Sequence, residues 1–153
     1  GYPRDRGLLQ ADGNFLVGAA NPFNGCLISS DVFEEVGNIK KEMFIWGDEV
    51  EFLYRLKSKG ILFATIVNSV VRHPFPRSKI VRVCGAFKLT IKDKALSLNM
   101  VRNIGYLNRE YGVNKKSLVV KLVIYYLLKA DLKYVWKIVN YYSDHEYQLP
   151  PSF

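Results

Sequence analysis

The sequence predicts an α/β domain that continues into a mainly helical C-terminal region. In residues 1–76, short apolar runs alternate with capped helical segments. Residues 77–153 hold the longest apolar-rich stretch, with helical spacing and several lysines. The 153 residues are 49% hydrophobic and 14% aromatic, which is enough to bury a core and argues against disorder.

The first predicted elements are short. Residues 1–22 are broken by Gly and Pro and predict a loop with one strand near Phe15–Val17. The run Phe23–Ile28 predicts a strand with a turn or bulge. Ser29-Ser30-Asp31 supplies capping side chains for a helix of about two turns that ends at Gly37.

The next predicted element is a helix that begins at Gly47-Asp48 and ends at Gly60. Glu51 and Arg55 within it are spaced to form an ion pair. Ile61–Val67 then predicts a buried strand, and Val70–His73 a second short strand that stops before Pro74.

The C-terminal region is predicted to be irregular from residue 77 and helical from about Lys92 to Tyr111, with Gly112 as the stop. Residues 117–142 predict a packed helix or helix pair. Four lysines there are expected to lie along one helical stripe: Lys121, Lys129, Lys133 and Lys137.

Charge separates the two parts of the chain. Residues 1–75 carry a net charge of −1, and residues 76–153 carry +9. Such asymmetry predicts an anionic partner for the second part, either a membrane surface, a nucleotide or a nucleic acid. The two cysteines, Cys26 and Cys84, are too few for a disulfide framework and favour a reducing compartment.

One segment combines residues suited to chemistry. Asp48 and Glu49 stand at a helix start, where the helix dipole favours anions and would keep a catalytic base ionised. Trp46 is a platform suited to the apolar face of a sugar ring, and Glu51 is expected to be structural because it shares a face with Arg55. The simpler alternative is a helix cap at Asp48, an ordinary first-turn acid at Glu49 and a core Trp.

His73 ends an apolar run just before Pro74. An imidazole at this place could ligate a divalent metal bound to a nucleotide diphosphate. The alternative is a histidine that bonds only to backbone or solvent.

The run from Asn24 to Pro74 resembles the second half of family-2 glycosyltransferases with the GT-A fold, most of all the rhamnosyl- and galactofuranosyltransferase-like branch. The matching motifs are Asn24-Gly25-x-Leu27-Ile28-Ser29, Val32-Phe33-x-x-Val36-Gly37, Phe44-Ile45-Trp46-Gly47-Asp48-Glu49-Val50-Glu51-Phe52-x-x-Arg55, Gly60 and His73. Asn99-Met100-Val101-Arg102-Asn103 looks like the family's aromatic-x-x-Arg-Asn segment, with Asn99 in place of the aromatic residue.

The resemblance implies an inverting transferase that moves a sugar from a nucleotide-diphosphate donor, UDP- or dTDP-linked, to a glycan or lipid-linked glycan. It implies Glu49 as the base, with Asp48 before it as the second candidate, although the family more often has Asp at the second position. It also implies Mn²⁺ or Mg²⁺ with His73 as a ligand. Three residues fall where the acceptor pocket is expected: Trp46, Asn24 and Gly25.

The family's Asp-x-Asp motif is absent from this sequence. We therefore expect a partial GT-A fold that lacks the N-terminal nucleotide-binding half, with residues 1–76 as the acceptor and base part and 77–153 as the basic helical part. Such a fragment is expected to be inactive alone. The expected location is cytoplasmic, peripheral at the inner face of the membrane.

The basic tail leaves alternatives open. Its longest uncharged run is Leu122–Leu128, too short to span a bilayer. Lysines beside Tyr and Trp suit an anionic membrane surface, and the same pattern arises when a helix packs its apolar face on the domain. A nucleic-acid-binding module has the charge but no recognised motif here. A non-catalytic interaction domain is a further alternative.

Overall fold

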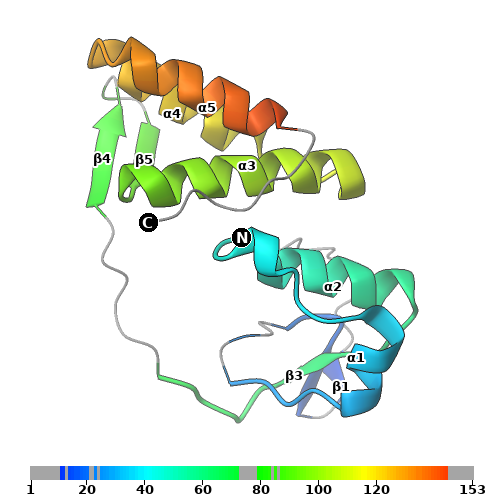
Figure 1. The fold of residues 1–153 in the computed structure, drawn as a ribbon. Helices are drawn as coiled ribbons and strands as arrows, with labels where there is room; N and C mark the ends of the chain where they lie inside the picture. Colours follow the sequence, from blue (N-terminus) through cyan, green and yellow to red (C-terminus); the bar gives the residue numbers. More distant parts are fainter. Residues whose placement is uncertain are drawn as a thin grey trace. The chain divides into compact units, whose positions relative to one another are not determined.

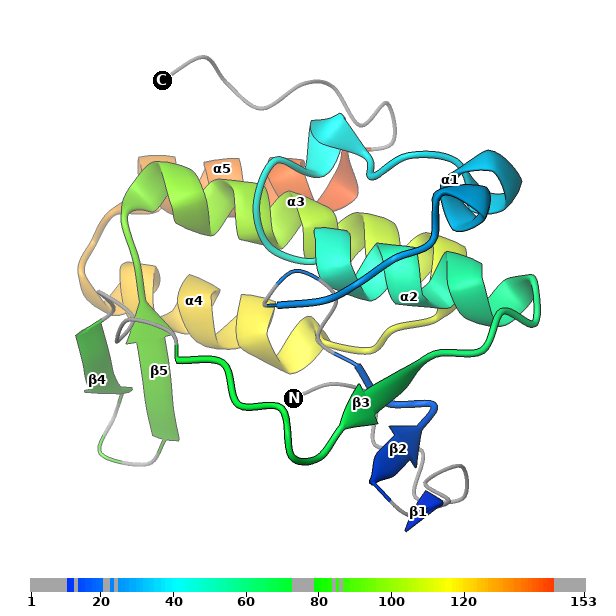
Figure 2. The ribbon, with the colours of Figure 1, turned by 90° about the horizontal axis from the view of Figure 1, so that it is seen from below.

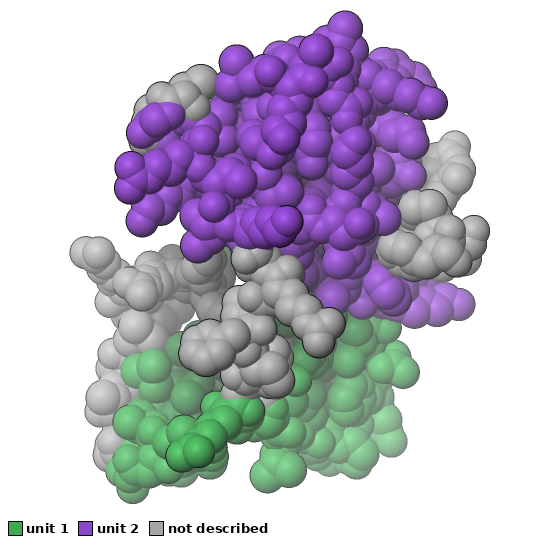
Figure 3. Space-filling model, turned by 90° about the vertical axis from the view of Figure 1, so that its left-hand side faces the viewer, with its two compact units in different colours: residues 1–39, 48–75 green, residues 40–47, 76–153 purple. Residues whose placement is uncertain are grey.

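The computed structural model describes residues 11–12, 14–20, 23, 25–72, 79–83, 85 and 87–144. The chain divides into two compact units, coloured separately in Figure 3. Unit 1 comprises residues 1–39 and 48–75, and unit 2 comprises residues 40–47 and 76–153. The division near residue 76 lies where the composition changes, but residues 40–47 group with the second unit.

Unit 1 is a small α/β unit (Figure 1). Its strands form an antiparallel sheet of order β1-β2-β3, with Leu16 opposite Thr65. Helix α2 buries Phe52, Leu53 and Leu56 against apolar residues of α1 and of the flanking segments. Its elements are β1 (Ala11–Asp12), β2 (Phe15–Val17), α1 (Ser30–Val36), α2 (Asp48–Ser58) and β3 (Ala64–Ile66).

Unit 2 combines a β-hairpin with three longer helices (Figure 2). Strands β4 and β5 pair antiparallel, and α5 packs against both α3 and α4. The elements are η1 (Lys41–Met43), β4 (Lys79–Val83), β5 (Phe87–Ile91), α3 (Lys94–Tyr111), α4 (Lys116–Leu128) and α5 (Leu132–Ser143).

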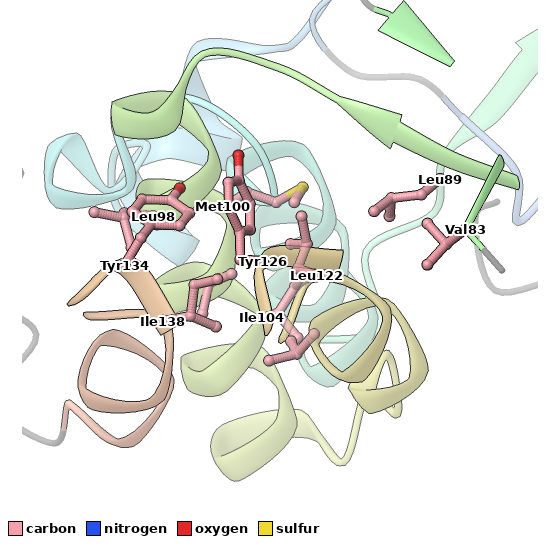
Figure 4. Close-up of a cluster of buried hydrophobic side chains, with 11 residues drawn as sticks. Val83, Leu89, Leu98, Met100, Ile104, Leu122, Tyr126, Tyr134 and Ile138 are labelled. Carbon is pink, nitrogen blue, oxygen red and sulfur yellow. The ribbon is translucent and has the colours of Figure 1, made fainter. Parts of the chain in front are cut away.

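The core of unit 2 is built from one face of each helix and the inner side of the hairpin (Figure 4). The rings of Tyr126 and Tyr134 meet edge to face with centroids 4.3 Å apart. The Tyr134 hydroxyl donates to the carbonyl of Lys94 at 2.7 Å, which satisfies its polar end in the core. Burial of the phenol is the largest influence on the pKa of Tyr134 and raises it far above its usual value.

Several predicted elements are confirmed. Strand β2 lies at Phe15–Val17, and helices α1, α2 and α3 end at or just before the glycines that the sequence indicated. Ser29 occupies the cap position of α1, but its side chain makes no capping hydrogen bond. The predicted helix pair is present as α4 and α5.

Other predictions are wrong. No strand forms at the described residues of Phe23–Ile28, where Gly25 has a positive φ of 74°. The predicted buried strand at Ile61–Val67 is only Ala64–Ile66, at the edge of the sheet, and its side chains are exposed. Val70–Arg72 form no strand. The segment predicted to be irregular after residue 77 holds the β4–β5 hairpin.

The lysine stripe is also wrong. The helix ends at Leu128 and a new one begins at Leu132, with Ala130 in the left-handed region at φ 54°. Lys121 therefore lies on α4, whereas Lys133 and Lys137 lie on α5. Among the described residues, no helix is long and apolar enough to cross a bilayer.

Candidate functional site

Two neighbouring carboxyl groups open helix α2. Asp48 is the first residue of the helix, and its carboxyl hydrogen bonds with that of Glu49. Burial, then this hydrogen bond and the charge of Glu49, raise the pKa of Asp48 to about 6. Backbone N–H groups at the helix start act in the opposite direction but are outweighed. The expectation that the helix start keeps both acids fully ionised is thus corrected for Asp48.

Asp48→Asn is expected to stabilise the protein at pH 8 and to lose that advantage near pH 4. A carboxyl whose folded pKa is raised binds its proton more tightly in the folded state, so its ionisation destabilises the fold as the pH rises from about 4 through 6. At pH 8 the free energy of unfolding of Asp48→Asn should exceed that of wild type by on the order of 1 kcal/mol, after allowance for solvent screening.

Urea unfolding of Asp48→Asn and wild type at both pH values measures this effect. The exposed first-turn acid of α1, replaced as Asp31→Asn, is the matched control and should show no such gain. A variant less stable than wild type at pH 8 would contradict the raised pKa.

The third acid of the segment has a structural role. The Glu51 side chain is fully buried and forms an ion pair with Arg55 at 2.9 Å. Arg55 also donates to the carbonyls of Val36, Gly37 and Asn38, at 2.6, 3.2 and 3.0 Å. The pair therefore ties α2 to the end of α1, which confirms the predicted pairing of Glu51 with Arg55.

Gly25 lies against the segment that leads to residue 73. It has a φ of +74°, and a Cβ there would overlap the Cγ2 atom of Val71. Any other residue would be strained and would push Val71 away. Gly25 is therefore beside Val71 within unit 1, while Asn24 and His73 lie outside the described residues.

In unit 2, the loop that precedes the acid pair has an unusual backbone. Phe44 and Trp46 have φ values of 56° and 77°, and Gly47 has a φ of 97°. Left-handed conformations cost non-glycine residues roughly 1 kcal/mol or more, so surrounding contacts must hold them. At Gly47, a Cβ would come within 3.0 Å of Leu107 Cδ1, so a larger residue would require the Leu107 side chain to move.

Three buried polar side chains of α3 hold this loop. Asn99 Nδ2 donates to the carbonyls of Met43 and Ile45 at 3.0 and 2.7 Å. Asn103 Nδ2 donates to the same two carbonyls and to that of Trp46, the last at 2.6 Å.

Arg102 adds a bond to the carbonyl of Glu42 and one to Asn99 Oδ1, both at 2.6 Å. We call Asn99, Arg102 and Asn103 the α3 clamp. Sequence reasoning noted these residues without giving them a role. Their signal is the i, i+3, i+4 spacing of polar residues on a helix that is otherwise buried.

Asn103→Ala is expected to destabilise the protein by about 1–3 kcal/mol, because the carbonyl of Trp46 loses the Asn103 donor and those of Met43 and Ile45 keep only the bond from Asn99. Because the loop is then less firmly held, the environment of the Trp46 ring should also change. Thermal unfolding and the Trp46 emission, recorded in a Trp136→Phe background, test both effects. The exposed Asn140→Ala on α5 is the control, and an Asn103→Ala protein that matched it in both readouts would contradict the clamp.

The ring of Trp46 is already in contact with its own unit. It packs against the unit 2 core, and Lys92 Nζ lies 3.7 Å from its ring centroid. Burial lowers the pKa of Lys92. The simpler interpretation of Trp46 as a core residue thus holds in part, and one face of the ring carries an ammonium group. Its role as a sugar platform stays a prediction.

Metal binding has no direct support in the described part of the chain. Within those residues, no group of three or more His, Cys, Asp or Glu side chains could hold a metal ion. The predicted ligand His73 lies outside them.

The sequence is similar to enzymes of known activity. Galactofuranosyltransferase GlfT1 of Mycolicibacterium smegmatis is 32% identical over 107 residues, which cover 69% of this chain and 35% of that protein. GlfT1 of Mycobacterium tuberculosis, from two strains, is 29% identical over 126 residues that cover 74% of this chain and 41% of that protein. This chain is related to glycosyltransferases.

The glycosyltransferase relationship confirms the predicted resemblance at that general level. The chain spans little more than a third of the length of these curated relatives. No known family model matches the sequence, and no solved structure matches it. The GT-A assignment therefore stays a prediction.

The residues that the glycosyltransferase resemblance indicated are distributed over both units. Asp48 and Glu49 are in direct contact in unit 1, where Gly25 also lies. Trp46 belongs to unit 2, two residues before Asp48 in the chain. Within unit 2, the α3 clamp fixes the backbone of the loop that carries Trp46, a role that the sequence alone did not indicate.

Proposed function

We propose that this chain carries the acceptor side and the catalytic base of an inverting glycosyltransferase. The observation that carries the proposal is the hydrogen-bonded carboxyl pair of Asp48 and Glu49, with the pKa of Asp48 raised to about 6. A carboxyl with a raised pKa beside a second carboxyl is typical of acid–base sites. The strained loop directly before them, held by buried side chains, supports the same conclusion.

In the proposed reaction, Glu49 accepts the proton of an acceptor hydroxyl. The hydroxyl oxygen attacks the anomeric carbon from the face opposite the leaving group, and the bond from that carbon to the nucleotide diphosphate breaks. The diphosphate leaves with the electron pair, the proton stays on Glu49, and the configuration inverts. Asp48, hydrogen bonded to Glu49, tunes the pH at which the pair can accept a proton.

The proposed donor is a nucleotide-diphosphate sugar, UDP- or dTDP-linked, and the acceptor is a glycan or lipid-linked glycan. The relatives are named galactofuranosyltransferases, which makes UDP-galactofuranose the first donor to test. We include Mn²⁺ or Mg²⁺, with His73 as a ligand, in the proposal on the resemblance alone. The steps above use only the chain's own carboxylates.

The test is a transfer assay with the protein as its gene encodes it, using UDP-galactofuranose and dTDP-rhamnose as donors with glycan and lipid-linked glycan acceptors. The expected result is a glycoside whose anomeric configuration, read by NMR, is inverted relative to the donor. A product with retained configuration, or no transfer from either donor, would overturn the proposal.

A further inference from the structure

Helices α4 and α5 each carry a second apolar stripe on the side away from the core. On α5, Leu132, Trp136 and Val139 repeat at i, i+4 and i+7 and are 66%, 66% and 50% exposed. The residues that α5 buries, Tyr134 and Ile138, lie on the opposite side. Ordinary helices of a globular domain are polar on the face that points to water.

Helix α4 repeats the pattern. Val120 and Leu127 are spaced i, i+7 on one side of the helix, and Leu128 extends them, while Ile124 between them is partly buried against the core. Val120, Leu127 and Leu128 are exposed, while Val119, Leu122 and Tyr126 face the core. Because α4 and α5 are packed against each other (Figure 1), we define the α4–α5 surface as the exposed side chains Val120, Leu127, Leu128, Leu132, Trp136 and Val139.

Positive charge accompanies this surface. Residues 115–144 contain six lysines and two aspartates, a net charge of +4. Lys133 and Lys137 are exposed on α5 next to the apolar stripe, and Lys129 follows the end of α4. Asp131, one of the two acids, is held by Lys94 at 2.6 Å and caps α5 through the Tyr134 N–H. Its charge is therefore offset by a lysine outside the helix pair.

We propose that the α4–α5 surface docks on an anionic lipid bilayer. Apolar side chains with a Trp among them, beside lysines, match a membrane interface, where the apolar groups enter the headgroup boundary and the lysines meet acidic lipids. A second copy of the chain would bring surfaces of the same positive sign together. The phosphates of a nucleic acid would pair with the lysines, but the apolar stripes would then stay exposed to water.

The experiment is co-sedimentation of the 153-residue chain with vesicles of phosphatidylcholine, with and without about 30 mol% phosphatidylglycerol. Binding to the anionic vesicles only, reduced by high salt, is the expected result. Leu132→Ser/Trp136→Ser should weaken binding by about tenfold or more. Leu27→Ser, at another fully exposed leucine, is the matched control and should bind as wild type does.

The charge contribution is tested by Lys133→Gln/Lys137→Gln, which should lower the affinity for anionic vesicles by about tenfold. Lys59→Gln/Lys88→Gln removes the same charge elsewhere on the exposed surface and should have little effect. In a Trp46→Phe protein, Trp136 is the sole Trp, so its emission should shift to the blue when anionic vesicles are added.

Three results would overturn the proposal. The first is an absence of binding to anionic vesicles by a wild-type chain that is folded by circular dichroism. The second is vesicle binding that Leu132→Ser/Trp136→Ser leaves unchanged, with no shift of the Trp136 emission. The third is a dimer in sedimentation velocity, or a salt-dependent gel shift with DNA or RNA, without vesicle binding.

Discussion

Glu49→Gln is expected to lower the rate of sugar transfer by about 10²–10⁴-fold, the usual contribution of a general base. Gln keeps the size of the side chain but accepts no proton, so the acceptor hydroxyl would have to attack in its protonated form. Binding of the nucleotide-sugar donor should be unchanged, because the carboxylate acts on the acceptor. The measurement is kcat, together with donor affinity by calorimetry, in the protein as its gene encodes it.

The same assay separates the two acids of the pair. Asp48→Asn should retain turnover if Glu49 is the base, and it should remove any inflection of the pH–rate profile near pH 6 that comes from ionisation of Asp48. If Glu49→Gln retains turnover and Asp48→Asn abolishes it, the base is Asp48. The exposed acid of α1, replaced as Glu35→Gln, should leave kcat and the profile as in wild type.

Of the substitutions considered, Arg55→Met is expected to lower the stability most. The free energy of unfolding should fall by about 3 kcal/mol, and the Tm by about 10 °C. Met keeps much of the apolar stem but removes the partner of the buried Glu51 carboxylate. It also removes the donor to the carbonyls of Val36, Gly37 and Asn38, which end α1. Thermal unfolding followed by circular dichroism measures the loss.

The double variant Glu51→Gln/Arg55→Met distinguishes the cause. It removes the buried charge along with its partner, so it should be more stable than Arg55→Met alone. The exposed Arg82→Met on β4 is the matched control and should change the Tm by little. An Arg55→Met protein as stable as Arg82→Met would contradict the structural role of the pair.

The predictable parts of the fold are those with local signals. Glycines stop α1 and α3 at residues 37 and 112, and the apolar spacing between such stops defines the helices. The Glu51–Arg55 pair was predictable from its i, i+4 spacing. Periodicity alone did not locate the β4–β5 hairpin, since a strand is defined by pairing with another segment.

One strand prediction was wrong about the burial of its side chains. Ile61–Val67 is apolar enough to suggest a core strand, yet Ala64–Ile66 lie exposed at the edge of the sheet. Similarly, the continuous apolar stretch after residue 117 concealed the break at Ala130. Which side of an apolar segment meets the core depends on the neighbours it finds after folding.

Local patterns in the sequence are enough to predict an acid pair at a helix start, a Trp before it and a structural Glu51 behind it. The pKa of Asp48 and the backbone of the loop at Trp46 depend instead on the packing of the folded chain. Partial burial beside Glu49 raises the pKa of Asp48, against the helix start that sequence reasoning considered. The loop at Trp46 is held by Asn99 and Asn103, side chains more than fifty residues further along the chain. Desolvation and such long-range hydrogen bonds arise only when the chain is packed, so they could not be predicted from the local sequence around Asp48.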